Sequence, residues 1–165
     1  MKRIILVFAI LFSAAALHVR ADGFLASYDR EIIASCMVLE AGGEGSDGMQ
    51  AVLNVILNRA DGYLHRMVQQ TVKPGAFSCM SSIWSNAAPD YSPLINRAMN
   101  QSSAYEEAHR LICTMEQGLL FDNTGGATHY HADYIHPYWA DRLRYLTTIG
   151  HHIFYVERGR EVASL

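Results

Sequence analysis

Lysine is scarce in this chain of 165 residues, which contains only Lys2 and Lys73. Lysine and arginine together number 13 against 16 aspartates and glutamates, and three of the 13 lie within the first 21 positions. The remainder therefore has a net charge near −6 with histidine neutral. Nucleic acids and anionic membranes are bound through clustered basic side chains that displace counterions. The composition thus argues against nucleic acid as a partner.

Long apolar runs are absent except at the N-terminus. Lys2 and Arg3 precede an apolar run over residues 4–17, and residues 19–21 provide a small-residue cleavage pattern. This order is typical of a secretory signal peptide, and the run is short for a transmembrane helix. We predict a signal peptide at residues 1–21 and a single exported domain at residues 22–165. That domain is expected in the periplasm or outside the cell, without stable membrane insertion.

Cysteine is also rare. The three cysteines Cys36, Cys79 and Cys113 cannot all pair within one chain. Cys36 lies on an apolar helix face and is interpreted as a core residue. Cys79 and Cys113 then form the candidate disulfide of an exported protein. Three free thiols are the alternative.

Motifs for metal binding and for nucleophilic catalysis are missing from the sequence. The chain has no HExxH motif, no paired CxxC motif and no nucleophile elbow around a serine. Zinc remains an alternative because four histidines of the C-terminal half are possible ligands: His129, His131, His151 and His152. We interpret them as hydrogen-bonded packing residues, and we predict no metal and no cofactor.

Helical spacing of apolar residues dominates the first half of the domain. The pattern predicts one helix from Asp29 to the glycines at positions 42 and 43, where a helix C-terminus is expected. A second helix is predicted to begin at Asp47, with Gln50 completing a capping box, and to end near Arg59. Residues 61–93 are expected to be loop with short helices, because turn signals recur there.

The second half changes from helical to aromatic and β-branched character. Helices are predicted from Ser92 and from a capping box of Ser103 and Glu106. Short strands are predicted at residues 127–131 and 152–156, with loop or a short helix at 137–145. The sequence therefore predicts an α+β fold that is mainly helical, with a small β element in the C-terminal half.

One carboxylate interrupts the apolar face of the first predicted helix. Glu40 follows Ile33, Cys36 and Met37 at spacings of three and four residues, so these side chains share one face. Burial and the unsatisfied carbonyls of a helix C-terminus both disfavour a carboxylate anion. Glu40 is therefore the candidate general acid, which would protonate a leaving group. An ordinary solvated glutamate on a slightly rotated helix is the alternative.

Two other carboxylates are weaker candidates. Glu44 lies beyond two glycines, so helical geometry does not determine its direction, and we interpret it as a solvated loop residue. Asp133 lies in a histidine-rich segment and is an equally weak candidate for a catalytic carboxylate.

Aromatic side chains with polar tips gather near the C-terminus. Such rings suit sugar recognition, because the apolar face of a pyranose stacks on a ring while its hydroxyls meet polar groups. The candidate sugar-binding residues are Tyr130, His131, Trp139 and Tyr155. Since side chains alternate along a strand, we expect only one of Tyr130 and His131 to line a cleft.

Two segments resemble a known family. The stretch EIIASCMVLEAGGEGSDGMQAVLNVILNRA resembles the EA.GE...G..AV..VI.NR segment of the SleB/CwlJ-type cell wall hydrolases. The stretch GATHYHADYIHPYWADRLRYLTTIGHHIFY resembles the closing block of the same family. Both occur in the family's order between residues 31 and 155, which is nearly all of the predicted domain.

The resemblance implies that residues 22–165 form a lysozyme-like catalytic domain that acts on peptidoglycan glycan strands. The essential glutamate of the family falls on Glu40. Members are described as lytic transglycosylases, which cut the bond between N-acetylmuramic acid and N-acetylglucosamine and leave a 1,6-anhydro end. One carboxylate suffices for this reaction, because the sugar's own 6-hydroxyl attacks the anomeric carbon, whereas most glycosidases use two carboxylates.

The chain also departs from the family pattern. The usual EARGE of the family is EAGGE here, which removes a possible cationic contact but keeps both glutamates. There is no peptidoglycan-binding repeat in the sequence, so the chain does not support a role in spore germination. Two alternatives remain, a metal-dependent N-acetylmuramoyl-L-alanine amidase and a non-catalytic wall-binding protein. The sequence predicts no oligomeric state.

Overall fold

The computed structural model describes residues 23–83 and 89–160. The signal peptide predicted at residues 1–21 lies outside these ranges. Within them, no helix combines the length and the apolar character needed to cross a membrane.

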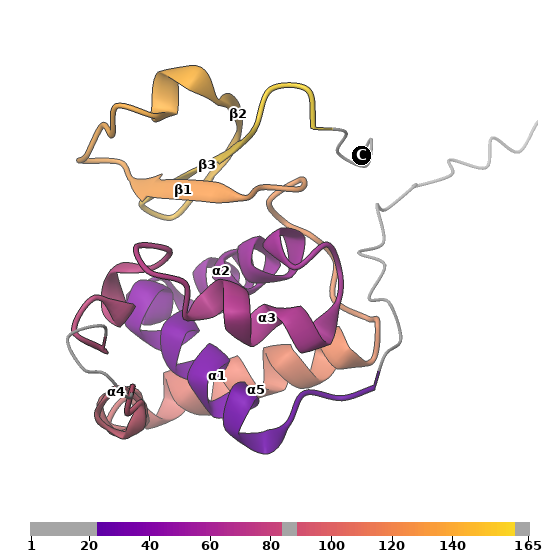
Figure 1. Cartoon of the computed structure of the whole chain (residues 1–165), viewed down its shortest axis with the longest axis vertical. Helices are drawn as coiled ribbons and strands as arrows, with labels where there is room; N and C mark the ends of the chain where they lie inside the picture. Colours follow the sequence, from indigo (N-terminus) through magenta and orange to yellow (C-terminus); the bar gives the residue numbers. More distant parts are fainter. Residues whose placement is uncertain (1–22, 84–88, 161–165) are drawn as a thin grey trace, which may run out of the picture.

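A layer of helices forms the body of the molecule, and a small sheet covers one side of it (Figure 1). The helices are α1 (Ser27–Ala41), α2 (Gly45–Arg59), α3 (Leu64–Thr71), α4 (Ser92–Met99) and α5 (Ser102–Glu116). Helix α1 contacts all four of the others, and its side chains Ile33, Cys36 and Met37 are fully buried. The apolar face predicted for this helix therefore lies in the main core.

The connection between α1 and α2 is tighter than expected. Helix α1 ends at Ala41 as predicted, but Gly42 keeps a right-handed backbone with φ of −59° and begins the 3-10 helix η1 (Gly42–Glu44). The left-handed turn falls at Gly45, with φ of 73°, and α2 begins there. The prediction that Asp47 caps α2 with Gln50 is wrong. The Gln50 side chain instead donates to the Phe121 carbonyl at 2.9 Å.

The capping box predicted for the last helix is also wrong. Helix α5 begins at Ser102, one residue before the predicted cap, and no side chain caps its N-terminus. The helix itself is confirmed, and so is the helix predicted from Ser92, which is α4. Side-chain capping was a weaker guide than apolar spacing, since Gln50 bonds to a distant carbonyl and Ser103 and Glu106 are exposed to solvent.

The sheet is antiparallel, with strand order β1-β3-β2. Its strands are β1 (His129–Ala132), β2 (Arg144–Ile149) and β3 (His152–Val156). The strand predicted at residues 152–156 is confirmed, and the one predicted at 127–131 is shifted to β1. Strand β2 was missed, because residues 137–145 were expected to be loop or short helix. That region contains the 3-10 helix η4 (Ala140–Arg142) and the start of β2.

Strand register gives the sheet two different faces. Tyr130 pairs with Phe154, and both side chains face the helical body, where Phe154 packs with Ala51 and Val55 of α2. His129 pairs with Tyr155, and since side chains alternate, these two residues face outward with His131. The mainly helical α+β class with a small C-terminal β element is confirmed.

Candidate active site

A groove of ≈470 Å³ lies between the helical body and the sheet. The end of α1 forms one wall with Leu39 and Glu40, and residues 76–78, which lead into the 3-10 helix η2 (Ser78–Met80), continue it. The opposite wall comes from residues 130–132 of β1, parts of the loop at 134–137, and His152. Glu40 is the only carboxylate among the described residues that line this groove.

The Glu40 carboxylate accepts three hydrogen bonds. The Ser78 hydroxyl and the Cys79 backbone N–H donate to Oε1, at 2.8 and 2.7 Å. The Tyr130 hydroxyl donates to Oε2 at 2.9 Å. Burial, together with the nearby Glu40 charge, raises the pKa of Tyr130 well above its ordinary value. Tyr130 therefore keeps its proton and remains a donor to Glu40 across the neutral pH range.

The surroundings of Glu40 are more polar than its helix face indicated. Glu40 is half-buried above a fully buried apolar face, as predicted, but its oxygens meet donors from distant segments. These donors lie 38, 39 and 90 residues further along the chain. The sequence could not reveal the first two, because residues 61–93 carried only turn signals.

Glu44 supports the site from behind. Only 14% of its side chain is exposed, and it lies 3.1 Å from His152 Nδ1. It also accepts from the His151 backbone N–H at 3.3 Å. The interpretation of Glu44 as a solvated loop residue is therefore wrong. The His152 ring in turn packs edge-on against Tyr130, with ring centroids 4.9 Å apart, so Glu44 positions the tyrosine that contacts Glu40.

The structure separates the four predicted sugar-binding residues into two groups. Tyr130 and His131 both line the groove although their side chains lie on opposite faces of the sheet, so the expectation that only one of them would do so is wrong. His131 is buried and stacks on Tyr155, with centroids 5.2 Å apart, and Trp139 packs against both. Trp139 and Tyr155 thus form an aromatic cluster on the outer face of the sheet and do not contact Glu40.

All three cysteines are free, so the disulfide predicted between Cys79 and Cys113 is not formed. Cys113 is exposed on α5, whereas Cys79 lies beside Cys36, with the sulfur atoms 3.8 Å apart. The core position predicted for Cys36 is confirmed, and burial raises the pKa of its thiol well above the ordinary value. The predicted pairing is wrong because the positions of cysteines in a sequence do not show which of them lie close together in the fold.

The four histidines considered as zinc ligands have other partners. His129 contacts Thr128 and Glu157, His131 contacts Tyr155, and His152 contacts Glu44. His151 lies 3.0 Å from Asp133, and this carboxylate raises the pKa of the imidazole. In residues 23–83 and 89–160, no three His, Cys, Asp or Glu side chains converge in an arrangement that could hold a metal ion.

The fold and the groove together define a lysozyme-like α+β domain with one glutamate facing a cleft. The model of the Cell Wall Hydrolase family matches residues 43–155. The chain therefore belongs to the Cell Wall Hydrolase family, as its resemblance to the SleB/CwlJ-type hydrolases implied. The matched residues include Glu44, Tyr130 and His152, and they begin three positions after Glu40.

Two solved structures share the fold. One is the catalytic domain of the germination-specific lytic transglycosylase SleB from Bacillus anthracis, with 23% identity and a TM-score of 0.57. That match covers 82% of this chain and 98% of the other. The second is the catalytic domain of the Bacillus cereus SleB protein, with 23% identity, a TM-score of 0.58, and coverage of 82% and 94%. Comparison with curated proteins finds no match.

Proposed function

We propose that this cell wall hydrolase cuts the glycan strands of peptidoglycan as a lytic transglycosylase, with Glu40 as acid and then as base. The observation that carries the proposal is the position of Glu40. It is the only carboxylate that the described residues place in the groove, and its orientation is held by three donors. The Bacillus anthracis SleB domain, which has the same fold, is a lytic transglycosylase.

The two oxygens of Glu40 have different environments, and this difference assigns their roles. Oε1 accepts from Ser78 and from the Cys79 N–H, so both of its lone pairs are engaged. Oε2 accepts only from Tyr130 within the described residues and has a lone pair free for a proton. The proton that is transferred to the substrate therefore belongs on Oε2. Oε1 fixes the rotation of the carboxyl group.

The reaction follows from this arrangement. Protonated Glu40 gives its proton to the glycosidic oxygen, and the bond from the anomeric carbon to that oxygen breaks. The 6-hydroxyl oxygen of the same muramic acid then bonds to the anomeric carbon, and its proton passes to the Glu40 carboxylate. The products are a free hydroxyl on one fragment and a 1,6-anhydro ring on the other. Water is not consumed, and Glu40 ends in its starting protonation state.

A single carboxylate separates this chemistry from the usual glycosidases. Retaining enzymes need a second carboxylate about 5–5.5 Å from the acid, and inverting enzymes need one about 6.5–9.5 Å away. Glu44, the nearest glutamate along the chain, is instead engaged with His152 behind the groove. An intramolecular nucleophile supplied by the sugar fits a groove with one carboxylate.

We also propose that the protein acts outside the cytoplasm after removal of residues 1–21. The basic, apolar and small-residue order of that segment supports export, and a substrate in the cell wall requires it. N-terminal sequencing of the protein recovered from the cell envelope tests this step, and a retained Met1 contradicts it.

The test of the proposed function is Glu40→Gln, which keeps the size of the side chain but cannot donate the proton. We expect release of muropeptides from purified sacculi to fall by about 10²–10⁴-fold, because general acid–base catalysis contributes about that much. Glu106→Gln is the matched control, since Glu106 is exposed on α5 and does not line the groove. It should digest sacculi at the normal rate.

Mass spectrometry of the products separates the alternatives. Anhydro ends from the unsubstituted protein support transglycosylation, whereas reducing ends indicate hydrolysis of the same bond. Cut stem peptides that disappear after treatment with EDTA indicate an amidase. No released muropeptides from the unsubstituted protein, even after long digestion, indicate a wall-binding protein and contradict the proposal.

A further inference from the structure

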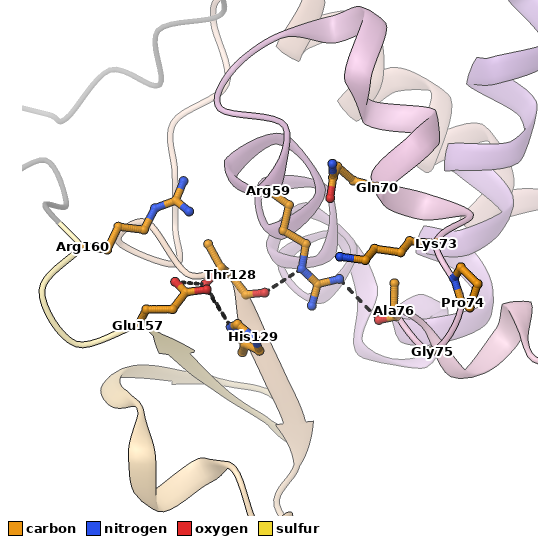
Figure 2. A pocket seen from close by; sticks show the side chains of 10 residues that line it. All are labelled: Arg59, Gln70, Lys73, Pro74, Gly75, Ala76, Thr128, His129, Glu157 and Arg160. Atoms are coloured by element: carbon orange, nitrogen blue, oxygen red, sulfur yellow. Dashed lines mark hydrogen bonds and ion pairs between the residues drawn. The ribbon is translucent and has the colours of Figure 1, made fainter.

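A second cavity, of ≈390 Å³, lies beside the groove (Figure 2). Its walls come from Arg59 at the end of α2, from the segment that contains Lys73 and Ala76, from Thr128 and His129, and from residues 157 and 160 after β3. We call it the basic pocket. Among its described lining residues, three are cationic and one is anionic.

The basic pocket and the groove are neighbours. Ala76 lines both cavities. Along β1 and the residue before it, residues 128–129 line the basic pocket and residues 130–132 line the groove. Strand residues advance about 3.3 Å each, so the midpoints of these two sets of lining residues lie about 8 Å apart along this strand. The basic pocket is therefore close enough to the groove to contact a group attached to a substrate bound there.

Two of the three cations have no anionic partner. Arg59 donates through Nε to the Thr128 carbonyl at 2.6 Å and through Nη1 to the Ala76 carbonyl at 3.3 Å. Both partners are neutral. Lys73 extends from the facing wall toward the Arg59 guanidinium (Figure 2). In the part of the chain that the structure describes, neither Arg59 nor Lys73 forms an ion pair.

The third cation is already engaged. Arg160 donates to the Asn58 carbonyl at 2.8 Å and forms an ion pair with Asp61 at 2.9 Å.

Arg59, whose guanidinium also lies 5.0 Å from the centroid of the Phe77 ring, and Lys73 are thus the two described cations of the basic pocket without an ion pair. Arg59 is half-buried, and this burial lowers the pKa of its guanidinium from the ordinary value. The charges of Glu157 and Glu40 offset part of the cost of burying this cation, but neither of these described carboxylates forms an ion pair with Arg59, so a bound anion would stabilise the cation further.

The remaining titratable groups of the basic pocket do not cancel this charge. Glu157 is anionic, and it accepts from the Thr128 hydroxyl at 2.8 Å. His129 is neutral near pH 7, because burial lowers its pKa by more than Glu157 raises it. The basic pocket thus stays net positive in a chain whose overall charge is −3.

We infer that the basic pocket binds a carboxylate of the stem peptide on the muramic acid next to the cleaved bond, an inference that rests on the proposed function. The N-acetylated sugars of the glycan strand carry no charge. The peptide attached to the muramic acid lactyl group is the source of carboxylates close to the strand. It branches from the glycan strand and can therefore reach a pocket that adjoins the groove. A guanidinium and an ammonium that face one space are suited to an oxygen anion.

Binding in a Glu40→Gln background tests the inference without requiring catalysis. The probe is a soluble glycan fragment that carries stem peptides, and a second probe is the same fragment with its peptide carboxylates converted to amides. We expect Lys73→Gln to raise the Kd for the acidic fragment by about three- to tenfold, the range of a partly exposed charge contact. The amidated fragment should bind weakly whether or not Lys73 is present.

Arg97→Gln is the matched control, because it removes the same charge from an exposed position on α4 outside the basic pocket. The inference is overturned if Lys73→Gln and Arg97→Gln bind the acidic fragment equally well, or if amidation does not change the Kd. The proposed function is judged separately, by anhydro ends released from sacculi by the unsubstituted protein. Failure of one therefore does not conceal failure of the other.

Discussion

Tyr130 has a structural and a chemical role, and the two can be separated. Its ring packs against Phe154 and His152 within the sheet, with centroids 5.5 and 4.9 Å away. It also packs against Phe77 of the main core, 6.2 Å away, and so helps to join the sheet to the helical body. Its hydroxyl donates to Glu40 at 2.9 Å. The first role needs only the ring, whereas the second needs the O–H group.

Tyr130→Phe should therefore keep the fold and weaken catalysis. Loss of a hydrogen bond to a charged group costs about 1.5–3 kcal/mol. We expect kcat on sacculi to fall about 10- to 100-fold, with KM changed less than about twofold. Tyr145→Phe is the control, because the Tyr145 hydroxyl bonds to Thr148 in its own strand and Tyr145 does not line the groove. Equal losses in the two variants would contradict the role of the Tyr130 hydroxyl.

At the scale of elements, the turn between β2 and β3 is joined to η1 through one glutamate. Glu44 extends from η1 to the His151 backbone and to the His152 ring. Gly150, in the same turn, has φ of 55°, and a Cβ there would lie 2.4 Å from Glu44 Oε2. The turn thus needs a glycine both for its backbone and for the close approach of the carboxylate.

Gly150→Ala should displace Glu44 and loosen the sheet from the helical body. Gly125→Ala is the matched control, because Gly125 also has positive φ, 68°, but nothing lies within 4 Å of a Cβ built there. A left-handed alanine costs about 1–2 kcal/mol at either position. At Gly150 the broken contacts add about 1–3 kcal/mol. Thermal melts should show a clearly lower Tm for Gly150→Ala, and equal Tm values would contradict this coupling.

The elements that sequence reasoning found are those with strong local patterns. Helix α1 and its Glu40 were predictable, because apolar residues at spacings of three and four define a face within one segment. Strand β2 was missed, since only half of its residues are even partly buried and its polar and apolar residues do not alternate cleanly. The donors Ser78 and Cys79 were missed as well, because only the tertiary structure shows that η2 lies next to the end of α1.

At the scale of the whole molecule, charged side chains join the helices at the periphery of the core. Arg30 of α1 forms an ion pair with Glu116 of α5 at 2.8 Å. Glu107 of α5 accepts from Ser46, in the first turn of α2, at 2.5 Å, and pairs with Arg110 in its own helix. The Glu107 contacts therefore link α2 to α5, and they depend on the ionised carboxylate.

Stability should depend on pH through Glu107. Hydrogen bonds from Arg110 and then Ser46 lower the pKa of Glu107 from 4.5 to about 2. A lowered folded-state pKa contributes stability above about pH 4.5, and that contribution is lost as the pH falls toward about 2. Glu107→Gln should thus lower Tm by about 1–4 °C at pH 7, since exposed pairs contribute at most about 1 kcal/mol. The difference from the unsubstituted protein should shrink below pH 4.5.

Glu106→Gln provides the baseline for these melts, because Glu106 lies beside Glu107 on α5 but is exposed. The acid destabilisation caused by protonating His129, whose pKa is lowered by burial, affects all variants alike and cancels in the difference. A difference in Tm between Glu107→Gln and the unsubstituted protein that stays constant from pH 7 to pH 3 would show that Glu107 acts through its shape. If the difference shrinks as the pH falls, Glu107 acts through its charge. Protonation then weakens the contacts by which Glu107 links α2 to α5.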